Sequence, residues 1–180
     1  MKLNFDQHQL SEIVLGTMRI NHKSTEEVYQ LLQTAKDHEI NVIDTADIYG
    51  HGDCERLLGE VFHTHPHLRE SFFLQSKCGI HITDDMTYYD FDEDYIIDCV
   101  NASLDRLQTD HLESLLLHRP DVLMDVEAVG RAFEKLYNAG KVRYFGVSNM
   151  NSAQLSYLQS AVHVPLRINQ LQLSAAYSPL

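Results

Sequence analysis

The ten residues that decide the fold run from Asn41 to Gly50 and read NVIDTADIYG. Two apolar residues typical of a buried strand lead directly into Asp44, and Tyr49 follows shortly before a glycine at which the chain turns. A carboxylate at the end of a buried strand is costly unless a positive group meets it. We therefore expect a cation at the end of another strand.

Later strand-like runs supply that cation and further polar residues. Lys77 closes the run at 72–79, and three consecutive leucines at 115–117 lead into His118. The polar residues at the carboxyl ends of successive predicted strands are Asp44, Lys77, His118, Asn149 and Gln170. Because an open α/β sheet concentrates its site at one switch point, contributions from so many strands favour the mouth of a barrel.

Amphipathic helices separate these strands along the chain. We predict strands at 13–18, 41–44, 72–79, 115–117, 142–147 and 166–173, and helices at 24–37, 53–62, 96–107, 126–138 and 151–162. A hairpin-like opening precedes them, and the segments at 63–67 and 83–86 are predicted as polar loops. Alternating strands and helices call for parallel pairing, so the fold class is α/β. No G-x-G-x-x-G motif follows the first strand, which argues against a doubly wound dinucleotide-binding fold.

The composition limits the classes of partner. The chain has 180 residues, of which 44% are hydrophobic, and a formal net charge of -12. Nucleic acids and anionic membranes are bound largely through basic patches, so we expect no nucleic acid and no membrane as a partner. The N-terminus has no apolar signal region, no stretch approaches the ~20 apolar residues that span a bilayer, and the cysteines lack C-x-x-C spacing. We therefore expect a cytoplasmic protein.

Three histidines at alternate positions raise the question of a metal site. His63, His65 and His67 surround a proline, and no carboxylate pair lies near them in the sequence. A metal site needs several ligands that converge on one point, and a polar, proline-containing stretch is more typical of a surface loop. We interpret the segment as a surface loop and predict no metal.

Four motifs lie in order along the chain. They are DTADIYG at 44–50 with ERLLG at 55–59, SK at 76–77, LLHRPD at 116–121 and GVSN at 146–149. Each motif alone is weak, but together they resemble the aldo-keto reductases. The resemblance extends from Gly16 to Gln170, which is nearly the whole sequence.

The resemblance implies a (β/α)8 barrel of the TIM type with a catalytic tetrad, Asp44, Tyr49, Lys77 and His118. Reduction of a carbonyl by hydride transfer builds negative charge on its oxygen, so a proton donor must lie within hydrogen-bonding reach. Tyr49 is the expected donor, because an adjacent ammonium makes a phenol more effective in this role. Lys77 supplies the ammonium, Asp44 keeps it charged and oriented, and His118 positions the carbonyl.

The same resemblance implies NADP(H) as the cofactor. Residues that match the family's nicotinamide-binding positions are Ser148, Asn149 and Gln170, with Gly16, Thr17 and Met18 at the mouth near the ring. The cofactor supplies the hydride, and the substrate is a small carbonyl compound, an aldehyde or a ketone that becomes an alcohol.

Each site residue also has a structural alternative. Asp44 and Lys77 can form a structural ion pair, His118 can cap a loop, and Gln170 can bind neighbouring backbone. The acidic and aromatic run at 84–95 is interpreted as solvated loop and helix start, with a substrate-facing loop as the alternative. The tyrosine and histidine at matching places favour the catalytic interpretation of the ion pair.

The length departs from the family's pattern. A closed barrel takes about 250 residues, and this chain ends after its sixth predicted strand. We therefore expect an incomplete barrel of about six parallel strands, in a single domain over residues 1–180 that lacks the C-terminal part. Cofactor binding is then weakened or lost, and open sheet edges favour self-association. The alternative function is that of a truncated, non-catalytic relic or interaction module.

Overall fold

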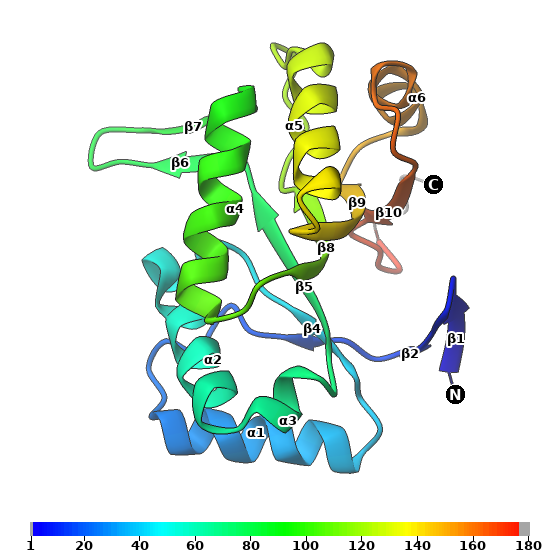
Figure 1. The fold of residues 1–180 in the computed structure, drawn as a ribbon. Helices are drawn as coiled ribbons and strands as arrows, with labels where there is room; N and C mark the ends of the chain where they lie inside the picture. The colour runs from blue at the N-terminus through cyan, green and yellow to red at the C-terminus, as the bar shows by residue number, and fades with distance from the viewer. Residues whose placement is uncertain (1, 177–180) are drawn as a thin grey trace. The chain divides into compact units, whose positions relative to one another are not determined.

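The structure, a computed structural model, describes residues 2–176 and consists of alternating strands and helices (Figure 1). The strands are β1 (Lys2–Phe5), β2 (His8–Ser11), β3 (Leu15–Gly16), β4 (Val42–Asp44), β5 (Phe73–Cys78), β6 (Ile80–Ile82), β7 (Thr87–Tyr89), β8 (Leu112–Leu117), β9 (Val142–Ser148) and β10 (Leu166–Gln170). The helices are α1 (Thr25–Asp37), α2 (Asp53–Thr64), α3 (Pro66–Arg69), α4 (Glu93–Leu107), α5 (Val126–Asn138) and α6 (Ser152–Ala161), with a short 3-10 helix, η1 (Tyr49–Gly52). The α/β class expected from the sequence is confirmed.

Six of the strands form one sheet, in the order β3-β4-β5-β8-β9-β10. The pairs β3–β4, β4–β5 and β9–β10 are parallel. The strands follow one another across the sheet in the order of the chain, without the switch point of a doubly wound sheet. This sequential order is that of a (β/α)8 barrel, and six strands make an incomplete one.

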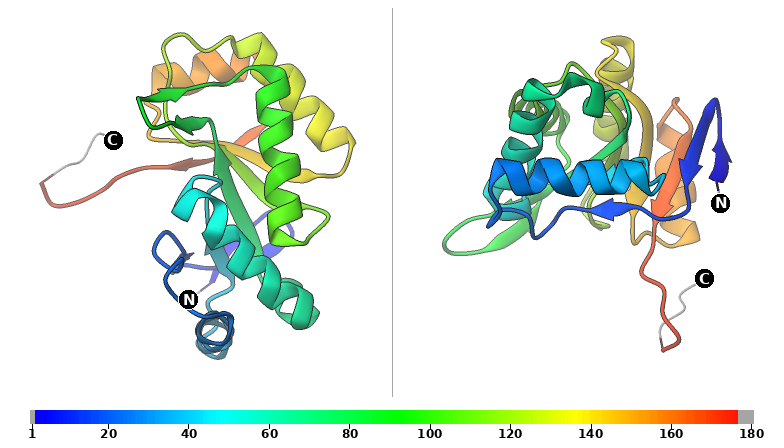
Figure 2. Two further views of the ribbon diagram at one scale, coloured as in Figure 1. Left: turned by 90° about the vertical axis from the view of Figure 1, so that its left-hand side faces the viewer. Right: turned by 90° about the horizontal axis from the view of Figure 1, so that it is seen from below.

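The chain forms two compact units. The first comprises residues 2–76 and 102–113, and the second comprises residues 77–101 and 114–176. In the first unit α1 packs beside α2, and α2 leads into α3 (Figure 2). Leu32, Leu58 and Leu68 from these three helices are fully buried, and each contributes about 1.5–3 kcal/mol through burial. The expectation of a single domain over the chain stays a prediction.

Helix α1 begins where the sequence predicts it. The Ser24 hydroxyl accepts a hydrogen bond from the Glu27 N–H, and the Glu27 carboxylate accepts one from the Ser24 N–H at 2.8 Å. This reciprocal pair is a capping box, which satisfies two backbone donors at the helix start. Val28, Leu32 and Ala35 form the buried face of the helix. The helical period read from the sequence is therefore confirmed.

In the second unit, α5 packs against β9 and α6. The rings of Phe133 on α5 and Phe145 on β9 stack with centroids 4.3 Å apart, and both side chains are almost completely buried. Asn151 caps α6 through a second capping box, with Gln154. These contacts fix the strand that ends at Ser148.

The first predicted strand is shorter than expected. Only Leu15 and Gly16 pair, in β3, whereas Ile13 and Val14 are 64% and 46% exposed. Within the described residues β3 pairs with β4 alone, so apolar residues that precede it lack neighbours to bury them. At the other end of the sheet, β10 stops at Gln170, although the sequence predicted a strand to 173.

Of the two segments predicted as polar loops, the first is mostly helical and the second is a loop. Residues 63–67 hold the end of α2 and the start of α3, because Pro66 occupies the first turn of a helix, where a missing N–H costs nothing. Residues 83–86 form the tip of a hairpin made by β6 and β7, closed by a hydrogen bond from the Thr83 N–H to the Met86 carbonyl at 3.0 Å. The loop prediction for 63–67 is therefore wrong apart from His65, and the loop prediction for 83–86 is confirmed.

Stacked rings hold this hairpin to α4. The His81 ring on β6 lies 4.5 Å from the Tyr88 ring and 4.2 Å from the Tyr95 ring, measured between centroids. His81 Nε2 also lies 3.4 Å from a carboxylate oxygen of Asp90. The aromatic residues that the sequence suggested as solvated loop thus make an ordered contact within the second unit.

Candidate active site

Asp44 is the last residue of β4, at the carboxyl end of the strand as predicted, and is only 8% exposed. The N–H and the hydroxyl of Thr17 both donate to the Asp44 carbonyl, each at 3.0 Å. The side-chain amide of Gln75 donates from Nε2 to Oδ1 of Asp44 at 2.7 Å. The first unit therefore holds a buried carboxylate whose backbone and side chain are both fixed by neighbours.

Tyr49 follows on a tight turn. Its N–H donates to the Ala46 carbonyl at 3.1 Å, and the residue opens η1. Gly50 and His51 have φ angles of 58° and 54°, so the chain turns through left-handed backbone. A Cβ at Gly50 would lie 2.7 Å from Cβ of Asn21, which leaves room for glycine alone. The turn predicted here is confirmed, and it leaves Tyr49 half-buried.

Lys77 and His118 lie in the second unit. Lys77 is the last residue but one of β5 and is 2% exposed, and His118 directly follows β8 and is 8% exposed. The His118 N–H donates to the Cys78 carbonyl at 2.9 Å, which ties the histidine backbone to the residue after the lysine. Lysine is almost never buried this deeply unless it is paired. Both side chains are thus buried at strand ends, as the sequence predicts.

Three of the residues predicted to bind cofactor lie together in the second unit. The Ser148 hydroxyl donates to the Gln170 carbonyl at 3.2 Å, and the Asn149 side-chain amide donates to Ser148 Oγ at 3.1 Å. The Asn149 N–H donates to the same Gln170 carbonyl at 3.0 Å, while its Oδ1 accepts from the Gln172 N–H at 3.1 Å. A hydroxyl and two amides therefore gather at the carboxyl ends of β9 and β10.

The other three residues predicted to bind cofactor lie in the first unit. A Cβ on Gly16 would meet no atom within 4 Å, so the space beside its Cα is open. Met18 is 54% exposed, and its carbonyl accepts a weak hydrogen bond from Cys54 Sγ at 3.7 Å. Thr17 is fully buried and bonded to Asp44. Gly16 and Met18 are accessible, whereas Thr17 supports the end of β4.

The tetrad residues are divided between the two units. The carboxylate of Asp44 and the phenol of Tyr49 belong to the first unit, and the ammonium of Lys77 and the imidazole of His118 belong to the second. Each lies in or just after the strand end that the sequence indicated. The convergence of these two pairs stays a prediction.

The buried side chain of Glu55 supports this region, a role that the sequence did not reveal. Glu55, in α2, is fully buried and accepts from the Ser76 hydroxyl at 2.7 Å and from Arg106 Nε at 2.8 Å. A Cβ on Gly59 would lie 2.0 Å from the Arg106 carbonyl, so α2 approaches the end of α4 too closely for a side chain. The ERLLG motif thus has a structural meaning that its spacing alone did not reveal.

Gln75 was also missed. Its signal was present, because a polar residue interrupts the apolar run that opens β5. Its partner, Asp44, is distant in the sequence, and only the strand register brings the two together. Local patterns do not contain that register.

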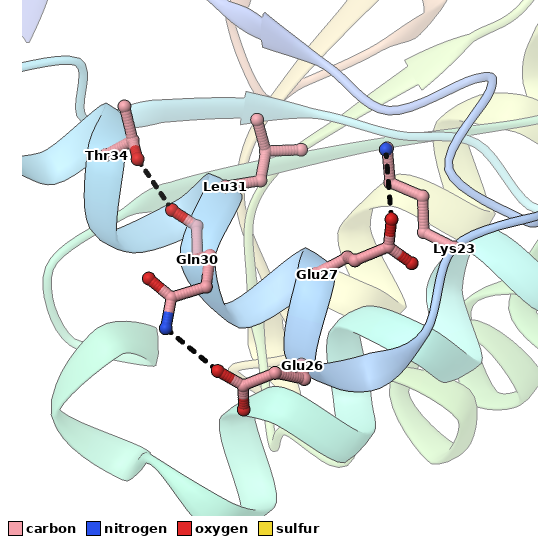
Figure 3. Close-up of a pocket in the computed structure, with 6 residues that line it drawn as sticks. All are labelled: Lys23, Glu26, Glu27, Gln30, Leu31 and Thr34. Carbon is pink, nitrogen blue, oxygen red and sulfur yellow. Dashed lines mark hydrogen bonds and ion pairs between the residues drawn. The ribbon is translucent and has the colours of Figure 1, made fainter.

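A shallow hollow on α1 is a separate feature (Figure 3). Its polar side chains bind one another: Gln30 donates to Glu26 at 2.8 Å, Thr34 donates to the Gln30 carbonyl at 2.8 Å, and Lys23 lies 4.0 Å from Glu27. The figure shows these groups directed along the helix surface toward their partners. The hollow is therefore best explained by the solvated face of an amphipathic helix.

Two classes of feature are not found between residues 2 and 176. No group of three or more His, Cys, Asp or Glu side chains is arranged to hold a metal ion. Instead, the His65 ring stacks on Tyr29 with 4.2 Å between centroids. None of the helices in this range has both the length and the apolar character needed to cross a membrane.

Comparison with known proteins gives a consistent result. Residues 12–179 match the sequence model of the aldo/keto reductase family. The oxidoreductase YdhF of Escherichia coli (strain K12) is 40% identical over 178 residues, which cover 96% of this chain and 60% of that protein.

Solved structures agree on the fold. Aldo-keto reductase AKR11C1 from Bacillus halodurans, in its holo form, has a TM-score of 0.82 at 24% identity, over 96% of this chain and 57% of that one. An aldo/keto reductase from Klebsiella pneumoniae, solved in complex with NADP and acetate, has a TM-score of 0.66 at 29% identity, over 84% and 50%. The chain thus spans 60% of YdhF and 57% of the Bacillus protein.

Proposed function

Because this chain belongs to the aldo-keto reductase family, we propose that it reduces aldehydes or ketones to alcohols by hydride transfer from NADPH. The observation that carries the proposal is the burial of a carboxylate, an ammonium and an imidazole at strand ends, in Asp44, Lys77 and His118. Buried titratable groups of opposite charge cluster at functional sites more often than elsewhere.

The chain's own residues handle the proton. The cofactor supplies a hydride to the carbonyl carbon. Tyr49 gives its hydroxyl proton to the carbonyl oxygen, so that a C–H and an O–H bond form as the C=O π bond breaks. The ammonium of Lys77 stabilises the phenolate that remains, and Asp44 keeps that ammonium oriented. Solvent then returns a proton to Tyr49.

His118 has a different role from the proton donor. Its imidazole donates a hydrogen bond to the carbonyl oxygen, and that bond strengthens as negative charge develops there. The fixed backbone of His118, tied to the Cys78 carbonyl, suits a residue that must orient a substrate.

The residues at the ends of β9 and β10 fit the nicotinamide carboxamide. That group offers one oxygen acceptor and an amide donor, and Ser148, Asn149 and Gln170 supply hydroxyl and amide partners for both. In the first unit, the open space beside Gly16 and the exposed side chain of Met18 fit the close approach of a flat ring. We propose that these residues hold the cofactor.

NADPH is the proposed cofactor form, since a solved family member holds NADP. We propose that it binds more weakly than in full-length relatives, because this chain matches 60% of the length of YdhF. The three cysteines lack the C-x-x-C spacing of a redox or metal motif, which suits a reducing compartment, and we propose a cytoplasmic location.

A non-catalytic interaction module is the second candidate. It is favoured by the two end strands of the sheet, β3 and β10, each of which has one strand neighbour among residues 2–176. End strands present unpaired backbone groups that another chain can meet, so this candidate includes self-association. Sedimentation at several protein concentrations measures it.

The test of the proposed function is NADPH-dependent reduction of a simple aromatic aldehyde by the full chain. We expect oxidation of NADPH that depends on both aldehyde and protein, with slower turnover on NADH. A cofactor fluorescence titration beside the assay separates binding from chemistry. If saturating NADPH binds and no turnover occurs with a range of aldehydes and ketones, the reductase proposal is wrong and the second candidate stands.

A further inference from the structure

One hydrogen bond joins two side chains that are both buried beside the predicted site. Gln75 is 7% exposed and Asp44 is 8% exposed, and Nε2 of the amide lies 2.7 Å from Oδ1 of the carboxylate. We propose that Gln75 is a positioning residue, whose amide holds the Asp44 carboxylate in the orientation from which it binds the catalytic lysine. The inference rests on the proposed function, which gives Asp44 that role.

Strand register makes the two residues direct neighbours. β4 and β5 pair in parallel with Asp44 opposite Gln75, so both side chains project to the same side of the sheet. The Thr45 N–H donates to the Gln75 carbonyl at 2.9 Å and extends this pairing beyond the end of β4. The backbone therefore fixes both Cα positions, and the side-chain hydrogen bond fixes the remaining rotation of the carboxylate.

Thr17 restrains the same residue from the opposite side. Its N–H and hydroxyl both bind the Asp44 carbonyl at 3.0 Å, just after β3. Asp44 is thus held through its backbone by the residue after β3 and through its side chain by β5. Two restraints from two neighbouring segments leave little freedom to a carboxylate that must meet a lysine at one position.

The chemistry of the donor suits this role. A buried carboxylate needs hydrogen-bond donors, and a cation would supply them but would also neutralise the charge. The Gln75 amide supplies a donor without a charge, so it places no second cation beside Asp44 to compete with Lys77. Lys77 is two residues after Gln75 in β5, and alternate residues of a strand project to the same side.

Three variants test the inference. Gln75→Met keeps the length of the side chain and removes its donor. Gln75→Glu introduces a carboxyl group at this position. When this carboxyl group is protonated, it donates a hydrogen bond to Asp44 as the amide does, and when it is ionised, it repels Asp44. The matched control is Gln30→Met, because Gln30 makes the same kind of hydrogen bond, to Glu26 at 2.8 Å, on the exposed face of α1 (Figure 3).

We expect Gln75→Met to lower kcat by about 10- to 100-fold with little change in KM, and Gln30→Met to leave both unchanged. For Gln75→Glu, kcat relative to the unsubstituted chain should fall as the pH rises. A merely structural role for Gln75 would lower that ratio equally at every pH. The inference is overturned if Gln75→Met keeps the full kcat, or if the Gln75→Glu ratio does not change with pH.

A second readout does not need turnover. The side-chain carboxyl signal of Asp44 is observed by NMR in protein labelled with ¹³C at aspartate and is assigned with Asp44→Asn. We expect this signal to move in Gln75→Met and to stay in place in Gln30→Met. An unmoved signal rejects the positioning role even in an active enzyme. A moved signal in a chain without turnover instead supports the positioning contact and rejects the reductase proposal.

Discussion

The hydroxyl of Ser76 donates to Oε1 of Glu55 at 2.7 Å, immediately before Lys77 in β5. Glu55 also binds Arg106, whose Nη2 lies 2.8 Å from Oε2, and the glutamate side chain is fully buried. A carboxylate of α2 therefore links the strand that leads to the predicted catalytic lysine with the end of α4. This contact gives the glutamate of the ERLLG segment a structural role in this chain.

Arg106→Met should destabilise the first unit strongly. It leaves the Glu55 carboxylate buried without its cation, and breaking a buried ion pair from one side costs about 3–5 kcal/mol. Arg56→Met is the matched control, because Arg56 and Asp53 form an exposed pair at 2.6 Å, which is worth about 0–1 kcal/mol. Urea unfolding measures both. If the two substitutions lowered the free energy of unfolding equally, the burial of Glu55 would not make its ion pair more important for stability than the exposed pair.

Gly59→Ala should also destabilise the fold. Alanine improves helix propensity by about 0.8–1 kcal/mol, but the added Cβ would lie 2.0 Å from the Arg106 carbonyl and force α2 away from α4, at a cost of about 1–3 kcal/mol. We expect the steric cost to prevail. Gly16→Ala, where a Cβ meets nothing within 4 Å, should leave the melting temperature unchanged and weaken NADPH binding. Stabilisation by Gly59→Ala would contradict the close packing of these helices.

The thiols of the three cysteines should differ in reactivity. Burial raises the pKa of the Cys54 thiol, because the thiolate would lose its solvation, and Cys78 is buried as well. Cys99 is partly exposed. With a thiol reagent and mass spectrometry, we expect Cys99 to be modified first in the native protein and all three after denaturation. If Cys54 were modified as fast as Cys99, the burial of the Cys54 thiol would be contradicted.

Glu93 should make stability depend on pH in the acid range. The hydrogen bond from Lys135 and then that from Arg131, each at 2.6 Å, lower the pKa of Glu93. Because the pKa of Glu93 is lower in the folded state than in the unfolded state, ionised Glu93 stabilises the fold at pH values above the unfolded-state pKa of about 4.3. This contribution is lost as the pH falls through the folded-state pKa. Glu93→Gln should therefore lower the melting temperature at neutral pH and converge with the unsubstituted chain in acid.

The control for Glu93 is Glu134→Gln, which removes the same charge from an exposed position of α5. It should change the melting temperature little at neutral pH. A difference between Glu93→Gln and the unsubstituted chain that persists unchanged into acid would contradict the role of the two cations.

The sequence predicts the features that depend on local pattern. The end of β4 at Asp44 and the cap of α1 at Ser24 were predictable, because strand ends and capping boxes are set within a few residues. Bonds between distant residues were not. The hydrogen bond between Gln75 and Asp44 depends on strand register, and the stacking that orders the β6–β7 hairpin depends on Tyr95 in a later helix.

Substitution of Tyr49 tests the central claim most directly. Tyr49→Phe removes the hydroxyl that gives up the proton and keeps the ring, so kcat for aldehyde reduction should fall by about 10²- to 10⁴-fold while NADPH binding by fluorescence is preserved. Tyr137→Phe, at an exposed position of α5, should leave kcat unchanged. Turnover by Tyr49→Phe at the rate of the unsubstituted chain would contradict the account.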